Sequence, residues 1–168
     1  HGAALDAAQA RVMNSIAIGN NATSGASTGG GQYSIAIGTR AEANSTDDSG
    51  SGAIAIGYYP SANGTNSIAI GNNANANITS GVALGDDAGV GENYAIAIVH
   101  SSRAEKICSI AIGNDSHASS NYGIAIGYNA EAKDEAIAIG KDTYISRLNG
   151  GIAIGAGARS GATDSNMY

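Results

Sequence analysis

The side chains best suited to chemistry in this chain are three histidines, His1, His100 and His117, and one cysteine, Cys108. A catalytic histidine needs a serine, cysteine or carboxylate partner in its motif, and a structural zinc site needs several ligands at short spacing. None of the three histidines stands in such a motif, and Cys108 has no second cysteine with which to pair. The sequence therefore predicts no enzymatic activity, no bound metal and no cofactor.

Composition and repeat length exclude further classes of function. A net charge of −6 and a pI near 4.8 leave no basic stripe for the phosphates of a nucleic acid. Acyltransferases with a left-handed β-helix repeat in sixes, and calcium-binding repeats need a nine-residue Gly-Gly-x-Gly-x-Asp pattern; this chain has neither. No apolar run approaches the roughly 20 residues of a membrane-spanning helix, so we expect any membrane anchor to lie outside this sequence.

The elements that carry these residues are repeats of one short motif, first seen as Ser15-Ile16-Ala17-Ile18-Gly19. Successive copies are 19 residues apart at first and then 13 to 15 apart, most often 14. A fixed short period predicts a solenoid rather than a globular core. The ten apolar cores begin at Ile16, Ile35, Ile54, Ile68, Val82, Ile96, Ile110, Ile124, Ile137 and Ile152.

Each copy predicts two short strands that together form one flattened coil. The first strand is Ile-Ala-Ile, and we expect its two large side chains to fill the interior, because stacked β-branched residues suit a parallel sheet. A glycine such as Gly19 follows, where the chain needs a tight turn or a positive φ. The second strand reads small-variable-small, as in Ala41-Glu42-Ala43, with its small residues inside and its variable residue in solvent. At the sixth copy Val99 replaces the glycine, so we expect a different turn there.

The other face of the Ile-Ala-Ile strand carries only small residues, and we predict that it is a subunit interface. A face exposed to water would not be so uniform, and such a thin roll buries little apolar surface of its own. Both points predict an obligate oligomer. The predicted interface residues are Ser15, Ala17, Ser34, Ala36, Ala53, Ala55, Ser67, Ala69, Ala83, Ala97, Ala111, Ala125, Ala138 and Ala153.

Three regions are expected from this pattern. Residues 1–14 are predicted to cap the roll and place Leu5, Ala8 and Val12 at helical spacing. Residues 15–162 form the roll itself. The longer early spacings add polar surface loops at residues 25–32 and 45–52. Residues 163–168 are expected to lead into a neck or stalk.

The motif Ser-Ile-Ala-Ile-Gly-x-x-Ala-x-Ala, repeated at 14-residue spacing over about residues 14 to 162, resembles the YadA-like head repeats of trimeric autotransporter adhesins. This resemblance implies an all-β, left-handed parallel β-roll of about ten coils that assembles as a homotrimer. It also implies display on the bacterial outer membrane and adhesion to host matrix proteins of the collagen, fibronectin or laminin type, or to host cell receptors. The number three comes from the resemblance alone.

Two functions remain open at this point. The first is an adhesive head that binds through its exposed faces, and the second is a structural spacer or fibre segment without a ligand. For the first, the candidate ligand-binding residues are those of the variable column: Glu42, Arg103, His117, Glu131, Tyr144 and Arg159.

Overall fold

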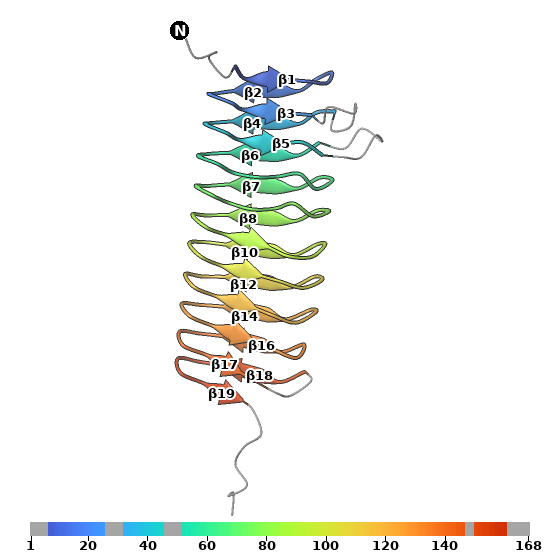
Figure 1. Ribbon diagram of the computed structural model, residues 1–168. Coiled ribbons are helices and arrows are strands. Elements are labelled where there is room, and N and C mark those ends of the chain that lie inside the picture. Colours follow the sequence, from blue (N-terminus) through green and yellow to red (C-terminus); the bar gives the residue numbers. More distant parts are fainter. Residues whose placement is uncertain (1–6, 26–31, 46–51, 147–149, 161–168) are drawn as a thin grey trace, which may run out of the picture.

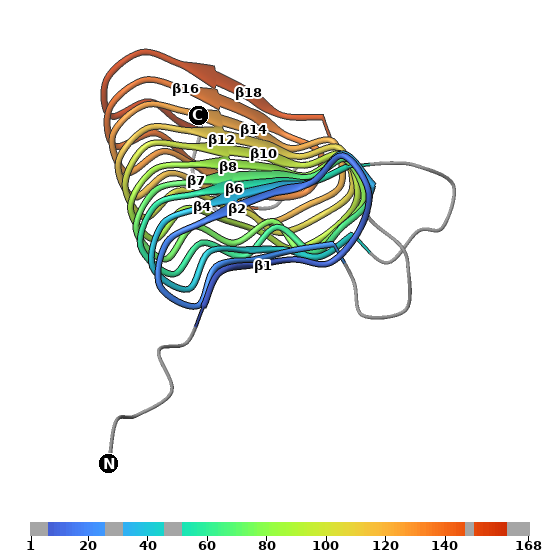
Figure 2. The same cartoon turned by 90° about the horizontal axis from the view of Figure 1, so that it is seen from above.

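The computed structural model describes residues 7–25, 32–45, 52–146 and 150–160. Within these ranges the chain is all-β, without a helix, and forms a parallel β-solenoid of about ten turns. Figure 1 shows the coils stacked as a rod, and Figure 2 shows that each coil is a flattened loop with a layer of strands on either side. The predicted loop segments and the run-in at residues 163–168 lie largely outside the described residues.

Two layers of strands run the length of the rod. The Ile-Ala-Ile sheet contains β2 (Ile16–Ile18), β4 (Ile35–Ile37), β6 (Ile54–Ile56), β7 (Ile68–Ile70), β8 (Val82–Leu84), β10 (Ile96–Ile98), β12 (Ile110–Ile112), β14 (Ile124–Ile126), β16 (Ile137–Ile139) and β18 (Ile152–Ile154). The second layer contains β1 (Gln9–Ala10), β3 (Thr23–Ser24), β5 (Glu42–Ala43), β9 (Gly89–Val90), β11 (Arg103–Ala104), β13 (His117–Ala118), β15 (Glu131–Ala132), β17 (Tyr144–Ile145) and β19 (Arg159–Ser160). Single parallel bridges through Ser61 and Asn75 connect β5 to β9, so this second sheet is continuous.

Every coil pairs with the next in parallel and in register. Ile96 of β10 pairs with Ile110 of β12, for example, and Arg103 of β11 pairs with His117 of β13. Equivalent positions of the repeat therefore stack into columns along the rod. This register confirms the alignment of the ten copies made from the sequence.

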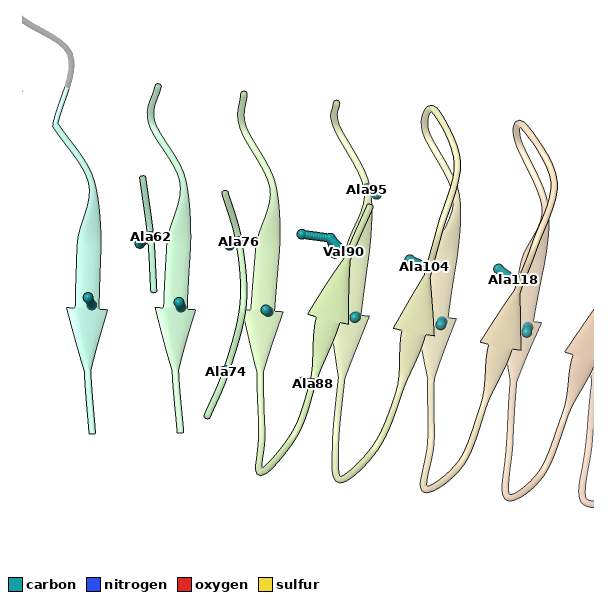
Figure 3. Packing of buried hydrophobic residues seen from close by; sticks show 14 of the residues in the cluster. Ala62, Ala74, Ala76, Ala88, Val90, Ala95, Ala104 and Ala118 are labelled. Carbon is teal, nitrogen blue, oxygen red and sulfur yellow. The ribbon is translucent and has the colours of Figure 1, made fainter. Parts of the chain in front are cut away.

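The interior of the roll is built of alanine, not isoleucine, which reverses one expectation. Ala36, Ala97 and Ala111 are completely buried, whereas the isoleucines on either side of each alanine are partly or fully exposed. The small residues of the second strands complete the core, as predicted. Figure 3 shows this packing, with Ala104 and Ala118 of adjacent coils among its members. The coil is flat, and the space between its two sheets is filled mainly by small side chains such as alanine and serine.

The turn after each Ile-Ala-Ile strand explains how successive coils can stack closely. Gly38 has a φ of +129°, and a Cβ on it would lie 1.8 Å from the carbonyl oxygen of Gly57 in the next coil. Glycine is therefore required both by its backbone conformation and by close contact between coils. Val99 adopts a φ of +92° at this position. Its N–H still donates to the carbonyl of Leu84 at 2.7 Å, as Gly113 does to Ile98, so the expected change of turn is limited to φ.

Two other departures from the repeat are visible. Ile145 is fully buried at a core position where most coils have alanine, and Thr143 beside it is also buried. In the predicted cap, the expected helix is wrong for residues 7–14, because Gln9 and Ala10 form strand β1 and pair in parallel with Thr23 and Ser24. The open edge of β3 is thus covered by a further strand, which satisfies backbone groups that a helix would leave unpaired.

Candidate functional site

The outer face of the second sheet gathers the six predicted ligand-binding residues in one column. Their side chains are exposed or half-buried, as the pattern small-variable-small predicted. Five of them occupy consecutive coils, since β11, β13, β15, β17 and β19 pair in this order. The sixth, Glu42, is separated from them by the coils of Ser61, Asn75 and Gly89. The structure therefore brings together Arg103, His117, Glu131, Tyr144 and Arg159.

A network of charged groups connects several of these coils. His117 Nε2 lies 3.0 Å from Glu105 Oε1, and its Nδ1 lies 3.9 Å from Glu131 Oε1. Lys133 Nζ lies 2.8 Å from the same Glu131 oxygen, donates to the Tyr144 hydroxyl at 3.4 Å and lies 5.1 Å from the centre of the Tyr144 ring. The pKa of Lys133 is raised above its ordinary value. The main cause is the hydrogen bond to Glu131, and the second is the hydrogen bond to Tyr144.

Glu105 and Lys133 belong to this network but were missed in the sequence. Each lies two residues after a member of the variable column, and residues two apart in a strand share a face. The period of two could therefore have identified them. Together with the five stacked residues they form a surface that we call the charged face: Arg103, Glu105, His117, Glu131, Lys133, Tyr144 and Arg159.

The charged face contains two shallow, open depressions. One lies at its lower end and is lined by Asn129, Glu131, Asp142, Thr143, Tyr144 and Arg159. The other lies at its upper end, where Gly89 and Gly91 have no side chains and where Arg103 and Glu105 are among the lining residues. Neither is enclosed enough to surround a small molecule, so the geometry suits contacts with the surface of a macromolecule.

The predicted subunit interface is wrong, because its residues face the interior of their own chain. Twelve of the fourteen are buried within a single chain, and the other two, Ser15 and Ala17, are half-buried on the first coil. The sequence correctly indicated that a second backbone packs closely on this face. That backbone belongs to the second sheet of the same chain, because each coil contributes one strand to either sheet.

The reversal leaves the isoleucines on the outside, where they form a continuous apolar strip. We define the isoleucine strip as the outward residues of the Ile-Ala-Ile sheet, such as Ile96, Ile98 and Ile110. Five of its side chains are at least 38% exposed, namely Ile16, Ile18, Ile70, Ile152 and Ile154, and the others are partly exposed. The strip extends over all ten strands of the sheet, and contiguous exposed apolar patches are typical of interaction surfaces.

Exposed tyrosines and a turn cluster complete the outer surface. The rings of Tyr58 and Tyr59 meet edge to face at 4.3 Å, and the Arg40 guanidinium lies 5.1 Å from the Tyr59 ring centre. The hydroxyl of Tyr59 raises the pKa of Tyr58 above its ordinary value. Asp86 and His100 occupy the equivalent turn position in two coils farther along the rod, and their side chains meet across these adjacent coils. Their spacing of 14 residues, one full period, is the signal that could have paired them.

The fold and surface together define a repetitive β-solenoid with an apolar strip on one sheet and a charged face on the other. Comparison with known families matches the YadA head domain repeat to residues 6–24, 30–59, 62–88 and 106–130, more than half of the chain. The chain therefore belongs to the YadA head family, the adhesin-type heads of trimeric autotransporters, as the repeat motif indicated. No curated protein and no solved structure matches the chain.

Family and fold together place the chain among adhesin-type head modules rather than typical enzymes. Heads of this family form trimers and belong to surface-exposed adhesins of the outer membrane. Over the described ranges, no helix is long and apolar enough to cross a membrane.

Proposed function

We propose that this chain is the adhesive head of a bacterial trimeric autotransporter and binds host matrix proteins or cell-surface receptors. The observation that carries the proposal is the charged face, in a chain that belongs to a family of adhesin heads. On this face, consecutive coils present Arg103, His117, Glu131, Tyr144 and Arg159. Partners of the collagen, fibronectin or laminin type fit a long, open surface better than a small ligand does. The head would be displayed outside the cell, with its anchor elsewhere in the protein.

The homotrimer is part of this proposal, and its interface moves from the alanines to the isoleucine strip. Three parallel rods with their isoleucine strips toward a common axis would remove a large apolar surface from water, at roughly 25 cal/mol for each Å² buried. The charged face lies on the opposite sheet and would remain accessible. The same assembly would therefore bury the isoleucine strip and leave the charged face exposed.

Trimerisation would also strengthen binding to a repetitive ligand. Three copies of the charged face on one particle turn later contacts into intramolecular ones, so weak individual contacts add up to high avidity. Because collagen-like and other fibrous matrix proteins are themselves repetitive, they could meet several faces at once. The shallow depressions fit this mode, since no single one needs to enclose its partner.

The proposal can be tested by binding of the assembled protein to immobilised matrix proteins. The Glu131→Ala/Tyr144→Ala double variant removes two stacked members of the charged face, and Tyr94→Ala removes a tyrosine that is more exposed than Tyr144 and lies in a turn away from that face. We expect the double variant to weaken binding at least tenfold and Tyr94→Ala to have little effect. Equal binding by both variants would contradict the assignment of the charged face.

The alternative is a spacer that only extends another binding domain. The observation in its favour is the uninterrupted ladder of parallel backbone pairs from β2 to β18, which makes the rod stiff. A folded trimer that binds no member of a matrix-protein panel and no host cells would support the spacer and overturn the adhesive role.

A further inference from the structure

Three potential metal ligands from two adjacent coils meet in the turn that follows the Ile-Ala-Ile strands. Asp86 and Asp87 belong to one coil and His100 to the next, and one ligand atom of each lies within 4.8 Å of the others. The backbone ladder aligns them, since Ser101 donates to the carbonyl of Asp86 at 2.8 Å. The side chains of His100 and Asp86 are about half exposed, at 49% and 47%, so a hydrated cation can reach them.

Neighbouring amides determine which nitrogen of His100 faces the carboxylate. Asn114 donates from Nδ2 to Asp115 Oδ2 at 2.6 Å, which directs its carbonyl oxygen toward His100. That oxygen lies 2.9 Å from His100 Nδ1, so Nδ1 must carry the proton. In the neutral imidazole, Nε2 is then a bare lone pair, and it faces Asp86 Oδ2 at 3.7 Å.

When the imidazole is neutral, two electron-pair donors face each other without a hydrogen between them, and the gap offers a position for a cation. Zinc ligands lie about 2.0–2.2 Å from the metal, so two ligands of a tetrahedral site are roughly 3.4 Å apart. The separation of 3.7 Å between His100 Nε2 and Asp86 Oδ2 is close to this value and is too long for a hydrogen bond. The arrangement therefore has the spacing of a coordination pair.

The surrounding residues also orient the carboxylates. Asn72 donates to Asp86 Oδ1 at 2.6 Å, and Asn73 donates to Asp87 Oδ1 at 2.7 Å. Each carboxylate thus has one oxygen held by the coil above. Outer hydrogen bonds of this kind, including the one from a ligand histidine to a carbonyl oxygen, typically accompany metal ligands.

We propose that Asp86, Asp87 and His100 bind a divalent transition-metal ion, of which Zn²⁺ is the simplest probe. One imidazole with two carboxylates suits Zn²⁺ and its neighbours better than Ca²⁺ or Mg²⁺, which take oxygen ligands. The ion would tie two coils of the rod together through their side chains. This site is independent of the adhesive role, because it lies in a turn rather than on the charged face.

The test is titration of the assembled protein with Zn²⁺ by calorimetry, in a His1→Ala background so that only two imidazoles remain. We expect one ion per chain in this background. His100→Asn should abolish binding without unfolding the protein, since asparagine occupies the same turn position at Asn72 and Asn114. Asn114→Ala should weaken binding about tenfold, because it releases the imidazole from its orienting partner.

Two matched controls make the result specific. His117→Asn removes the other imidazole, and Asp142→Asn removes a carboxylate from a lower coil of the same turn; both should retain zinc binding. Zn²⁺ should also raise the melting temperature of the parent but not of His100→Asn, because the ion binds only the folded turn. Unchanged binding in His100→Asn, loss of binding in His117→Asn, or no binding up to about 1 mM Zn²⁺ would each overturn the proposal.

Discussion

Ala97 and Ala111 lie directly opposite each other in adjacent parallel strands, and neither has any surface exposed to solvent. The isoleucines on either side of them point the other way and are partly exposed. This relationship recurs along the rod and accounts for both of its surfaces. An alanine interior permits a flat coil, and a flat coil forces the large side chains outward.

A larger side chain inside the coil should be far more harmful than one outside. We expect Ala97→Leu to lower the free energy of unfolding by at least about 1–3 kcal/mol, because the interior has no space for extra methylene groups. Ile96→Leu, a change of shape at the neighbouring outward position, should cost less than about 1.5 kcal/mol. Urea unfolding at equal chain concentration measures both. Equal losses in the two variants would contradict an alanine interior.

A charge in the isoleucine strip should weaken assembly. We expect Ile110→Asp to shift the protein from a threefold molar mass to smaller species at falling concentration, since burial of an unpaired carboxylate opposes association. Asn75→Asp introduces the same charge on the second sheet and should leave the mass unchanged. Light scattering, with circular dichroism to follow folding, distinguishes the two. An unchanged mass for Ile110→Asp would place the interface elsewhere.

Replacement of Val99 by glycine should stabilise the protein. A left-handed backbone costs a residue with a Cβ about 1–2 kcal/mol, and glycine gives back about 0.5–1 kcal/mol in chain entropy. The net gain expected for Val99→Gly is roughly 0.5–1 kcal/mol, seen as a higher melting temperature. The reverse exchange one coil above, Gly85→Val, should destabilise strongly, since its Cβ would lie 2.5 Å from the Val99 carbonyl oxygen. A lower melting temperature for Val99→Gly would show that the valine makes contacts that outweigh its strain.

The interaction of Lys133 with Glu131 and Tyr144 should appear in the pH dependence of stability. The pKa of Lys133 is raised in the folded chain, so its stabilising effect is complete below the unfolded value of about 10.4. The effect is lost as the pH rises through the raised pKa. We therefore expect Lys133→Gln to lower the melting temperature at neutral pH and to approach the parent protein at more alkaline pH. Lys106→Gln, at an exposed turn lysine, should differ little from the parent at any pH.

Much of this architecture could be predicted from the repeat. The ten copies define the coils, and their alignment correctly predicts the parallel register, the glycine turns and the outward column that includes Arg103 and Glu131. The family assignment rests on the same motif. These features follow from local rules, because a fixed period stacks equivalent residues and alternate residues of a strand share a face.

The direction in which each face points was decided only by the tertiary structure. Alternation shows that Ile96 and Ile98 lie on one face of the strand and Ala97 on the other. It does not show which face is inside, because isoleucines inside and alanines inside fit the pattern equally well. The choice depends on the separation of the two sheets within each coil, which leaves room mainly for small side chains such as Ala97. Contacts between side chains, such as His117 with Glu105 or His100 with Asp86, depend in addition on side-chain conformation. A linear pattern contains the period that aligns such pairs but not the three-dimensional arrangement that brings their atoms together.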